Sequence, residues 1–177
     1  MKPPLFRYAA VRTVEEAIET LASNPGAVVL AGGQSLIPAM NMRLAGPEML
    51  VDIQHVSSLR RLAVEDGWIV VGAMVRHREF ERDASVHAVN PLVREVMANV
   101  AHVPIRNRGT VVGSLCHGDA AAELPLLLIL CNGTVVCAGR GGRREIAAED
   151  FFQFHLSTAR LPEELAVEAR FCTLPSG

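Results

Sequence analysis

A pair of adjacent glycines near the N-terminus offers the first site for chemistry. They belong to Ala31-Gly32-Gly33-Gln34-Ser35-Leu36, which separates a continuous apolar run from the expected start of a helix. Glycine permits close approaches that other residues do not, so amides of such a loop can converge on an anion at the positive end of the helix. That chemistry suits a pyrophosphate. An ordinary tight turn with Ser35 as the helix cap explains the same residues, and the local pattern leaves both interpretations open.

A second glycine-containing segment mixes polar and apolar residues in the middle of the chain. It reads Arg106-Asn107-Arg108-Gly109-Thr110-Val111-Val112-Gly113-Ser114. Its amides and its two hydroxyl groups could form a second anion nest. A strand with bends is the alternative interpretation. Two such loops on different lobes would hold one ligand in the cleft between them.

Histidine and cysteine do not form a recognisable metal or catalytic motif. The six histidines lack the i, i+4 spacing of helical metal ligands, and no G-x-S-x-G motif for a hydrolase nucleophile is present. The four cysteines contain no C-x-x-C pair, so we expect reduced structural thiols and place any iron–sulfur cluster on another chain. We therefore name no catalytic side chain and no metal ligand.

The elements around the first loop predict a small parallel β/α lobe over residues 1–54. Thr13 and Glu16 have the spacing of a capping box, which predicts a helix whose apolar face includes Val14, Ala17 and Leu21. A buried strand is expected over 27–31, a helix over 36–43 and a second strand over 49–53. This alternation of strands and helices is typical of a parallel sheet.

Residues 55–177 predict a second lobe of α+β type with an antiparallel sheet. Strands are expected over 68–72 and 165–171, and a glycine-rich turn at 139–142 should join a hairpin of 134–137 and 143–146. Helices are expected over 77–82 and 91–101, whereas 124–130 fits a helix or a strand. The predicted fold class is therefore α+β, in two lobes.

Composition restricts the classes of partner and location. Half of the 177 residues are hydrophobic and the formal net charge is −2, so a sizeable core is expected and nucleic acid is not. The apolar run from Leu124 to Cys131 is far shorter than the roughly 20 residues of a membrane span. The N-terminus also lacks the apolar stretch of a secretory signal, which favours a cytoplasmic location.

Three longer motifs together resemble the FAD-binding subunit of the molybdenum hydroxylase family. This family includes the medium subunit of aerobic carbon monoxide dehydrogenase and the corresponding part of xanthine dehydrogenase. The motifs occur in the family order and at the expected separations, and they are the runs from Ala31 to Pro38, from Ile105 to Ser114 and from His117 to Pro125. Leu50-Val51-Asp52-Ile53 and Val71-Gly72-Ala73 support the resemblance. It implies a two-lobed FAD-binding module of the PCMH type.

The resemblance also implies positions for the cofactor. Both glycine loops would wrap the FAD diphosphate, which assigns Ala31 to Leu36 and Thr110 to Ser114 to the site. An acidic residue of the third motif would contact the adenosine side, with Glu123 as the first candidate and Asp119 as the second. A carboxylate at Glu123 suits vicinal ribose hydroxyls, although a solvated carboxylate at a helix start explains it too.

The chain departs from the family pattern at three points. Val112 stands where the family usually has glycine, so we expect its side chain to crowd the diphosphate and Val112→Gly to tighten FAD binding. Ala120 replaces a common proline, with some loss of turn rigidity. The family's C-terminal domain is expected to be absent, as in an excised domain, a split gene or a degenerate copy.

The function implied is electron transfer. Electrons would pass from a 2Fe-2S small subunit through FAD to an acceptor, while a molybdopterin-containing large subunit would oxidise the substrate. The alternative is a truncated, non-catalytic assembly domain that keeps the fold with weakened FAD binding.

Overall fold

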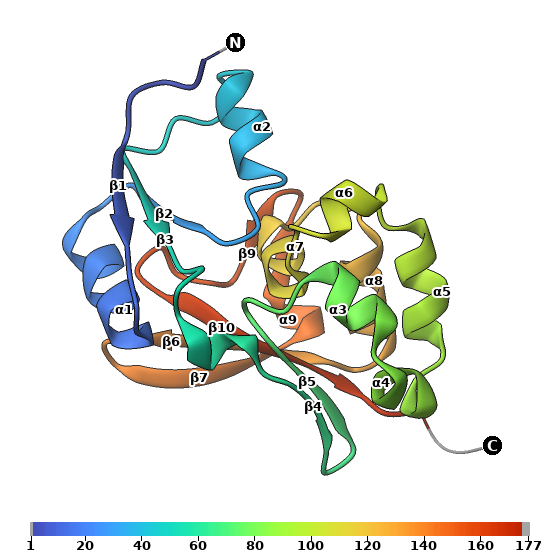
Figure 1. Cartoon of the computed structure of the whole chain (residues 1–177). Helices are drawn as coiled ribbons and strands as arrows, with labels where there is room; N and C mark the ends of the chain where they lie inside the picture. The colour runs from blue at the N-terminus through green and yellow to red at the C-terminus, as the bar shows by residue number, and fades with distance from the viewer. Residues whose placement is uncertain (1, 175–177) are drawn as a thin grey trace.

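The computed structural model describes residues 2–174. The N-terminal part of the chain, up to Asp52, forms a three-stranded parallel sheet (Figure 1). The strands are β1 (Arg7–Ala10), β2 (Ala27–Leu30) and β3 (Met49–Asp52), in the order β1-β3-β2. Helices α1 (Val14–Ser23) and α2 (Leu36–Asn41) connect them. The predicted parallel β/α lobe is confirmed.

The start of α1 shows a shifted form of the predicted capping box. The Thr13 hydroxyl accepts a hydrogen bond from the Glu16 amide at 3.1 Å, as predicted. The Glu16 carboxylate accepts from the amide of Arg12 at 2.7 Å instead of from the amide of Thr13. Both bonds still hold the entry of the helix, and Val14, Ala17 and Leu21 are buried beneath it.

Strand β2 is less buried than its apolar sequence suggested. Val28 remains 36% exposed, and the other three residues are partly buried. The reason is its position, because β2 is an edge strand of the sheet whereas β3 lies in the centre. The prediction of a fully buried strand was therefore wrong.

The second sheet is antiparallel, as the sequence predicted, and it has five strands, one of which, β4, was not predicted. Its order is β4-β5-β10-β6-β7. The strands are β4 (Leu62–Glu65), β5 (Trp68–Gly72), β6 (Thr134–Gly139), β7 (Gly142–Ala147) and β10 (Leu165–Cys172). Strand β10 lies in the centre and is mostly buried, while the β6–β7 hairpin closes at the predicted glycine-rich turn.

Short helices and one small hairpin complete the second part of the chain. The predicted helices near 77–82 and 91–101 are present, and 124–130 is helical. These elements are η1 (Ser57–Arg60), α3 (His77–Arg82), α4 (Ala84–Val89), α5 (Leu92–Asn99), α6 (Val103–Arg106), α7 (Val111–His117), α8 (Glu123–Leu130), α9 (Ala148–Phe151), β8 (Phe152–Phe154) and β9 (Ser157–Thr158). None of the helices in residues 2–174 has the length and hydrophobicity to cross a membrane.

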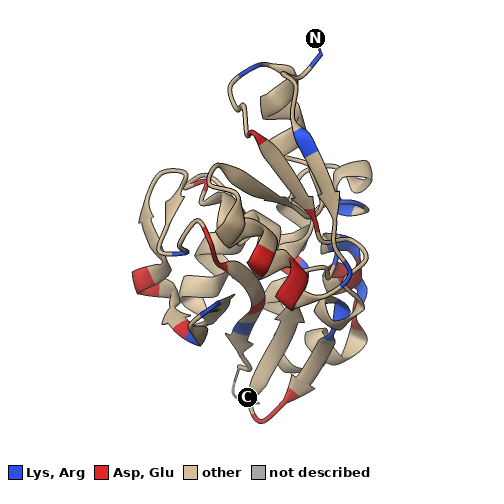
Figure 2. Ribbon diagram, turned by 90° about the vertical axis from the view of Figure 1, so that its left-hand side faces the viewer, with Lys and Arg blue, Asp and Glu red and all other residues tan. Residues whose placement is uncertain are grey.

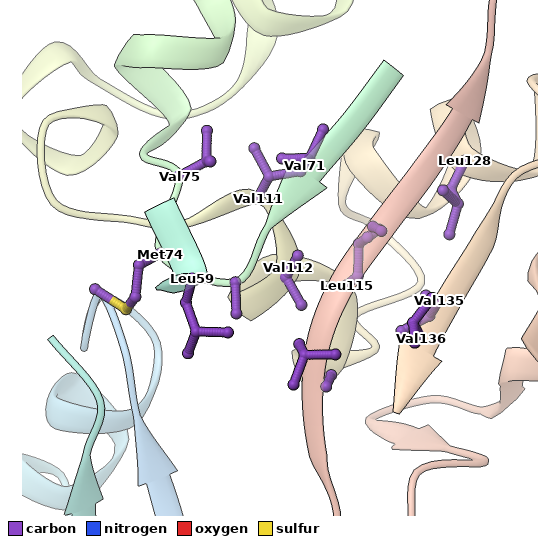
Figure 3. Packing of buried hydrophobic residues seen from close by; sticks show 14 of the residues in the cluster. Leu59, Val71, Met74, Val75, Val111, Val112, Leu115, Leu128, Val135 and Val136 are labelled. Carbon is purple, nitrogen blue, oxygen red and sulfur yellow. The ribbon is translucent and has the colours of Figure 1, made fainter. Parts of the chain in front are cut away.

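One hydrophobic core joins the two parts. Val14 and Val51 of the parallel lobe belong to the same buried cluster as Val71, Leu115 and Phe171 of the second lobe. Figure 3 shows part of this cluster, in which α7 packs between β5 and β10. Because the core is continuous, the division of the chain at residue 54 stays a prediction.

Candidate functional site

The Gly32-Gly33 loop leaves β2 at the carboxyl edge of the parallel sheet, where ligands of parallel sheets commonly bind. Gly33 has a φ of 71°, a conformation that glycine adopts easily. Among the described residues, the amides of Gly33, Gln34 and Ser35 have no hydrogen-bond acceptor. Ser35 does not cap α2 with its side chain, so the predicted alternative of a serine-capped turn is wrong.

The second loop leads into a helix and is not a strand with bends. Thr110 is the N-cap of α7, and its hydroxyl accepts a hydrogen bond from the Gly113 amide at 3.2 Å. The Ser114 amide donates to the Thr110 carbonyl at 3.0 Å. Within residues 2–174, the amides of Thr110 and Val112 are those of this loop that have no acceptor. The loop therefore offers fewer free amides than the sequence suggested, at the positive end of α7.

The two loops touch each other directly. A Cβ atom added to Gly32 would lie 2.5 Å from the Arg108 carbonyl oxygen and 3.0 Å from the Thr110 amide nitrogen. A Cβ on Gly113 would lie 3.9 Å from the Cβ of Ala31. Figure 1 shows the connection between β2 and α2 reaching the start of α7 near the centre of the molecule. Gly32 is thus required by the packing of one loop on the other.

Val112 does not crowd this junction with its side chain. The side chain is 2% exposed and belongs to the core, and its backbone lies in the first turn of α7. In Figure 3 it packs with its neighbours Val111 and Leu115 in the region between β5 and β10. Our expectation of a valine facing the diphosphate is therefore wrong, because the helical turn directs that side chain inward.

The third motif follows the other end of α7. Gly118 ends the helix with a φ of 64°, and the Asp119 carboxylate then accepts a hydrogen bond from the Ala121 amide at 2.9 Å. Glu123 is partly buried in the first turn of α8, where its carboxylate makes no hydrogen bond to a described residue. Since α7 has seven residues, its length puts roughly 10 Å between the second loop and this motif. A dinucleotide can span that separation, so contact of Glu123 or Asp119 with the ribose stays a prediction.

Residues 75–77 support the second loop, which no sequence motif indicated. The His77 amide donates to the Gly109 carbonyl at 2.9 Å, and the Val111 amide donates to the Val75 carbonyl at 3.1 Å. These bonds form a short antiparallel bridge between Arg76 and Thr110. The loop is therefore fixed from the second lobe as well as by its contact with Gly32.

His77 is buried against this loop as a neutral imidazole. Its Cε1 and Nδ1 atoms would lie 3.0 Å from a Cβ added to Gly109. Burial is the main reason why the pKa of His77 is lowered to about 4; the Arg106 and Arg76 charges act in the same direction, and the Thr110 backbone acts against them. Neither ring nitrogen has a hydrogen-bond partner of normal geometry in the described part of the chain.

Asp52 places a buried carboxylate at the same sheet edge. It lies at the end of β3, is 4% exposed, and accepts hydrogen bonds from the Tyr8 hydroxyl at 2.6 Å and the Gln54 amide at 2.9 Å. The bond to Asp52 is the main reason why the pKa of Tyr8 is raised. This network stabilises the edge from which the first loop leaves.

Three further features of the described residues were considered as sites: metal-binding side chains, cysteine thiols and a surface pocket. No group of three or more His, Cys, Asp or Glu among residues 2–174 could hold a metal ion. Burial raises the pKa of Cys116 to about 11 and of Cys137 to about 12, so these thiols are unreactive near neutral pH. A pocket of about 640 Å³ lies between the end of α1 and the β6–β7 turn, and no predicted cofactor residue lines it.

Comparison with known proteins identifies a family that the sequence of this chain matches. A family model described as the FAD binding domain in molybdopterin dehydrogenase matches residues 4–171. The alpha subunit of the 6-hydroxypseudooxynicotine dehydrogenase complex of Paenarthrobacter nicotinovorans is 40% identical over 178 aligned positions, which cover 100% of this chain and 60% of the relative.

Two solved structures show the same fold. Quinoline 2-oxidoreductase from Pseudomonas putida 86 superimposes with a TM-score of 0.95 at 40% identity, covering 98% of this chain and 61% of that one. Carbon monoxide dehydrogenase from Hydrogenophaga pseudoflava gives a TM-score of 0.97 at 36% identity, with 100% and 62% covered. The chain therefore spans about 60% of the length of the relatives it matches.

Proposed function

Because the chain belongs to the family of FAD-binding domains of molybdopterin dehydrogenases, we propose that it is the FAD-carrying electron-transfer part of a molybdenum hydroxylase. The observation that carries this proposal is the direct contact of the two glycine loops at the carboxyl edge of the parallel sheet. The amides of Gly33, Gln34 and Ser35, which have no acceptor among residues 2–174, follow directly on Gly32, where an added Cβ would lie 3.0 Å from the Thr110 amide nitrogen. Amides without protein acceptors at such a place suit a diphosphate.

The residues present fit an FAD molecule along α7. The diphosphate would lie against the Ala31 to Leu36 loop and the first turn of α7, where the partly buried Ser114 hydroxyl could donate a hydrogen bond, while Thr110, which is 2% exposed, caps the Gly113 amide with its hydroxyl. Glu123 at the start of α8, with Asp119 as the second candidate, would accept hydrogen bonds from the ribose. The Val112 side chain, which is buried in the core, would hold the first turn of α7 in place beside the diphosphate.

The chain's own residues bind and orient, and no side chain takes part in a covalent step. Bound FAD would supply the redox chemistry of its isoalloxazine ring, accepting electrons from one partner and passing them to another. The protein would exclude solvent from the diphosphate and hold its charge on backbone amides. A 2Fe-2S small subunit and a molybdopterin-containing large subunit are the partners in this proposal, and their compartment is the cytoplasm, where the free thiols of this chain remain reduced.

The alternative of an assembly domain with weakened FAD binding loses its main support. It relied on Val112 as an obstacle to the diphosphate, and this side chain lies in the core. Electron transfer through bound FAD better explains why the amides of Gly33, Gln34 and Ser35 have no acceptor among the described residues.

Titration of the purified chain with FAD tests the proposed function. We expect saturable binding that gives the visible absorption bands of oxidised flavin and quenches flavin fluorescence. A folded chain that stays colourless and does not bind added FAD would contradict the proposal.

A further inference from the structure

Arg76 stands where the second glycine loop meets the rest of the second lobe. It is the N-cap of α3, and its backbone is bridged to Thr110. The Glu79 carboxylate accepts a hydrogen bond from the Arg76 amide at 2.6 Å, which holds the residue at the helix start. The Arg76 guanidinium is thereby free to reach toward the loop.

The guanidinium donates a hydrogen bond to the carbonyl oxygen of Arg108. This is the same oxygen that would lie 2.5 Å from a Cβ on Gly32. One carbonyl group thus faces Arg76 from the second lobe and Gly32 from the first. Its position sets how closely the two loops approach each other.

The surroundings of Arg76 indicate that this bond has a purpose beyond charge pairing. No carboxylate among the described residues lies within 4.0 Å of its guanidinium. Burial, followed by the charge of Arg60, lowers the pKa of Arg76, so the group is held in an unfavourable place. Over the molecule as a whole, Figure 2 shows basic segments on the right-hand side of that view, mixed with acidic ones.

We propose that Arg76 is a positioning residue for the flavin cofactor, which holds the Arg108 carbonyl against Gly32 and so fixes the spacing of the two loops. The inference rests on the proposed function, in which these loops share the FAD diphosphate. A hydrogen bond from a charged donor is stronger than one between neutral groups, which suits a role in fixing backbone. The rival role for Arg76 is simple attraction of the diphosphate by its charge, and the two roles differ in measurable ways.

The test compares FAD dissociation constants of Arg76→Met, Arg76→Lys, Gly32→Ala and the double variant Gly32→Ala/Arg76→Met. Arg94→Met is the matched control, because Arg94 is exposed on α5 and its side chain makes no hydrogen bond or ion pair with a described residue. Titrations are made at low and high ionic strength, and circular dichroism in the visible range reports how the bound flavin is held. Urea unfolding without FAD shows that each variant is folded.

Positioning predicts that Arg76→Met weakens FAD binding about 10- to 100-fold, the scale of one lost hydrogen bond to a charged group. The loss should persist at high salt, Arg76→Lys should restore it only in part, and the visible dichroism of the flavin should change. Gly32→Ala should weaken binding less in the Arg76→Met background than alone, because the freed carbonyl can then move away.

Three results would overturn the proposal. They are equal affinity of Arg76→Met and the parent, full rescue by lysine together with a loss that vanishes at high salt, or additive effects of the two substitutions. If Arg76→Met is unfolded, Arg76→Lys and its salt dependence decide between the two roles. Failure of the parent chain to bind FAD contradicts the proposed function instead.

Discussion

At the scale of single residues, the backbone conformation of Gly33 leads us to predict that a larger residue there weakens FAD binding. Its φ of 71° is unfavourable for a β-branched residue, and an added Cβ would lie 3.2 Å from Cγ1 of Ile37. Such strain typically amounts to about 1–3 kcal/mol. We therefore expect Gly33→Val to weaken FAD binding roughly 10-fold or more while the chain stays folded. Flavin fluorescence titration with a thermal melt measures both, and unchanged affinity in a folded variant would remove this loop from the site.

His77 gives a prediction of pH dependence. Its pKa is lowered from the ordinary 6.5 to about 4, so as pH falls through this window the unfolded chain takes up a proton that the folded chain refuses. Titration of His77 therefore leaves the free energy of unfolding unchanged above about pH 6.5 and lowers it as the pH falls toward 4. Between pH 8 and pH 5 this effect of His77 amounts to about 2 kcal/mol.

The variant His77→Phe should remove this part of the pH dependence. Phenylalanine keeps a planar ring and leaves no buried nitrogen without a partner, so its unfolding free energy at pH 8 should match or exceed that of the parent. Urea unfolding at the two pH values gives the comparison. Identical pH dependence in both proteins would show that His77 is not the group responsible.

At the scale of elements, α7 carries part of the candidate site and part of the core. The backbone of its N-cap Thr110 lies beside Gly32 of the first loop, and its Val112 side chain packs inward. Val112→Gly should therefore lower the unfolding free energy by about 2–4 kcal/mol, through a lost buried side chain and the low helix propensity of glycine. FAD binding should weaken or stay equal. Urea unfolding beside Val112→Ala checks the order, and tighter FAD binding by Val112→Gly would restore our original expectation.

The same helix shows where sequence patterns succeed and fail. The segment from Thr110 to Ser114 resembles a bent strand, because its β-branched residues favour strands. It is nevertheless the start of a helix, which Thr110 caps and whose valines pack in the core. Strand β2 was predicted in the right place, but its burial depends on the strand order, which its own residues do not specify. Local patterns thus located most elements, whereas tertiary position decided their burial and one of their types.

The candidate site was predictable in its parts and not in its assembly. The glycines of both loops are visible in the sequence, and their family motifs placed them together. The contact between Gly32 and the Arg108 carbonyl depends on residues about 75 positions apart in the chain, and Arg76 and His77 belong to no motif. Residues that act by holding backbone leave little signal in one sequence.

At the scale of the whole molecule, the described residues form the fold that would hold FAD, and the proposed function leaves the redox chemistry to that cofactor. They contain no group of three metal-binding side chains, and the four cysteines lie apart from any cluster-binding motif. The continuous core fixes the elements that carry the two loops relative to each other, as the proposed FAD site requires. In the proposed function, partner subunits would oxidise the substrate at a molybdenum centre and deliver the electrons through iron–sulfur clusters.

We therefore expect the isolated chain to bind and exchange electrons with flavin reagents, and to leave hydroxylase substrates unchanged. Co-expression with candidate large and small subunits should yield a co-purifying assembly whose flavin is reduced when substrate is added. A relay needs the flavin close to a cluster on a partner, so the assembly should bury a stable interface of more than about 1,000 Å². The matched control is the same assembly carrying Gly33→Val, which should reduce its iron–sulfur clusters but transfer fewer electrons to FAD. Turnover of a hydroxylase substrate by this chain alone, free of molybdenum and iron, would contradict the prediction, as would complete partners that never bind it.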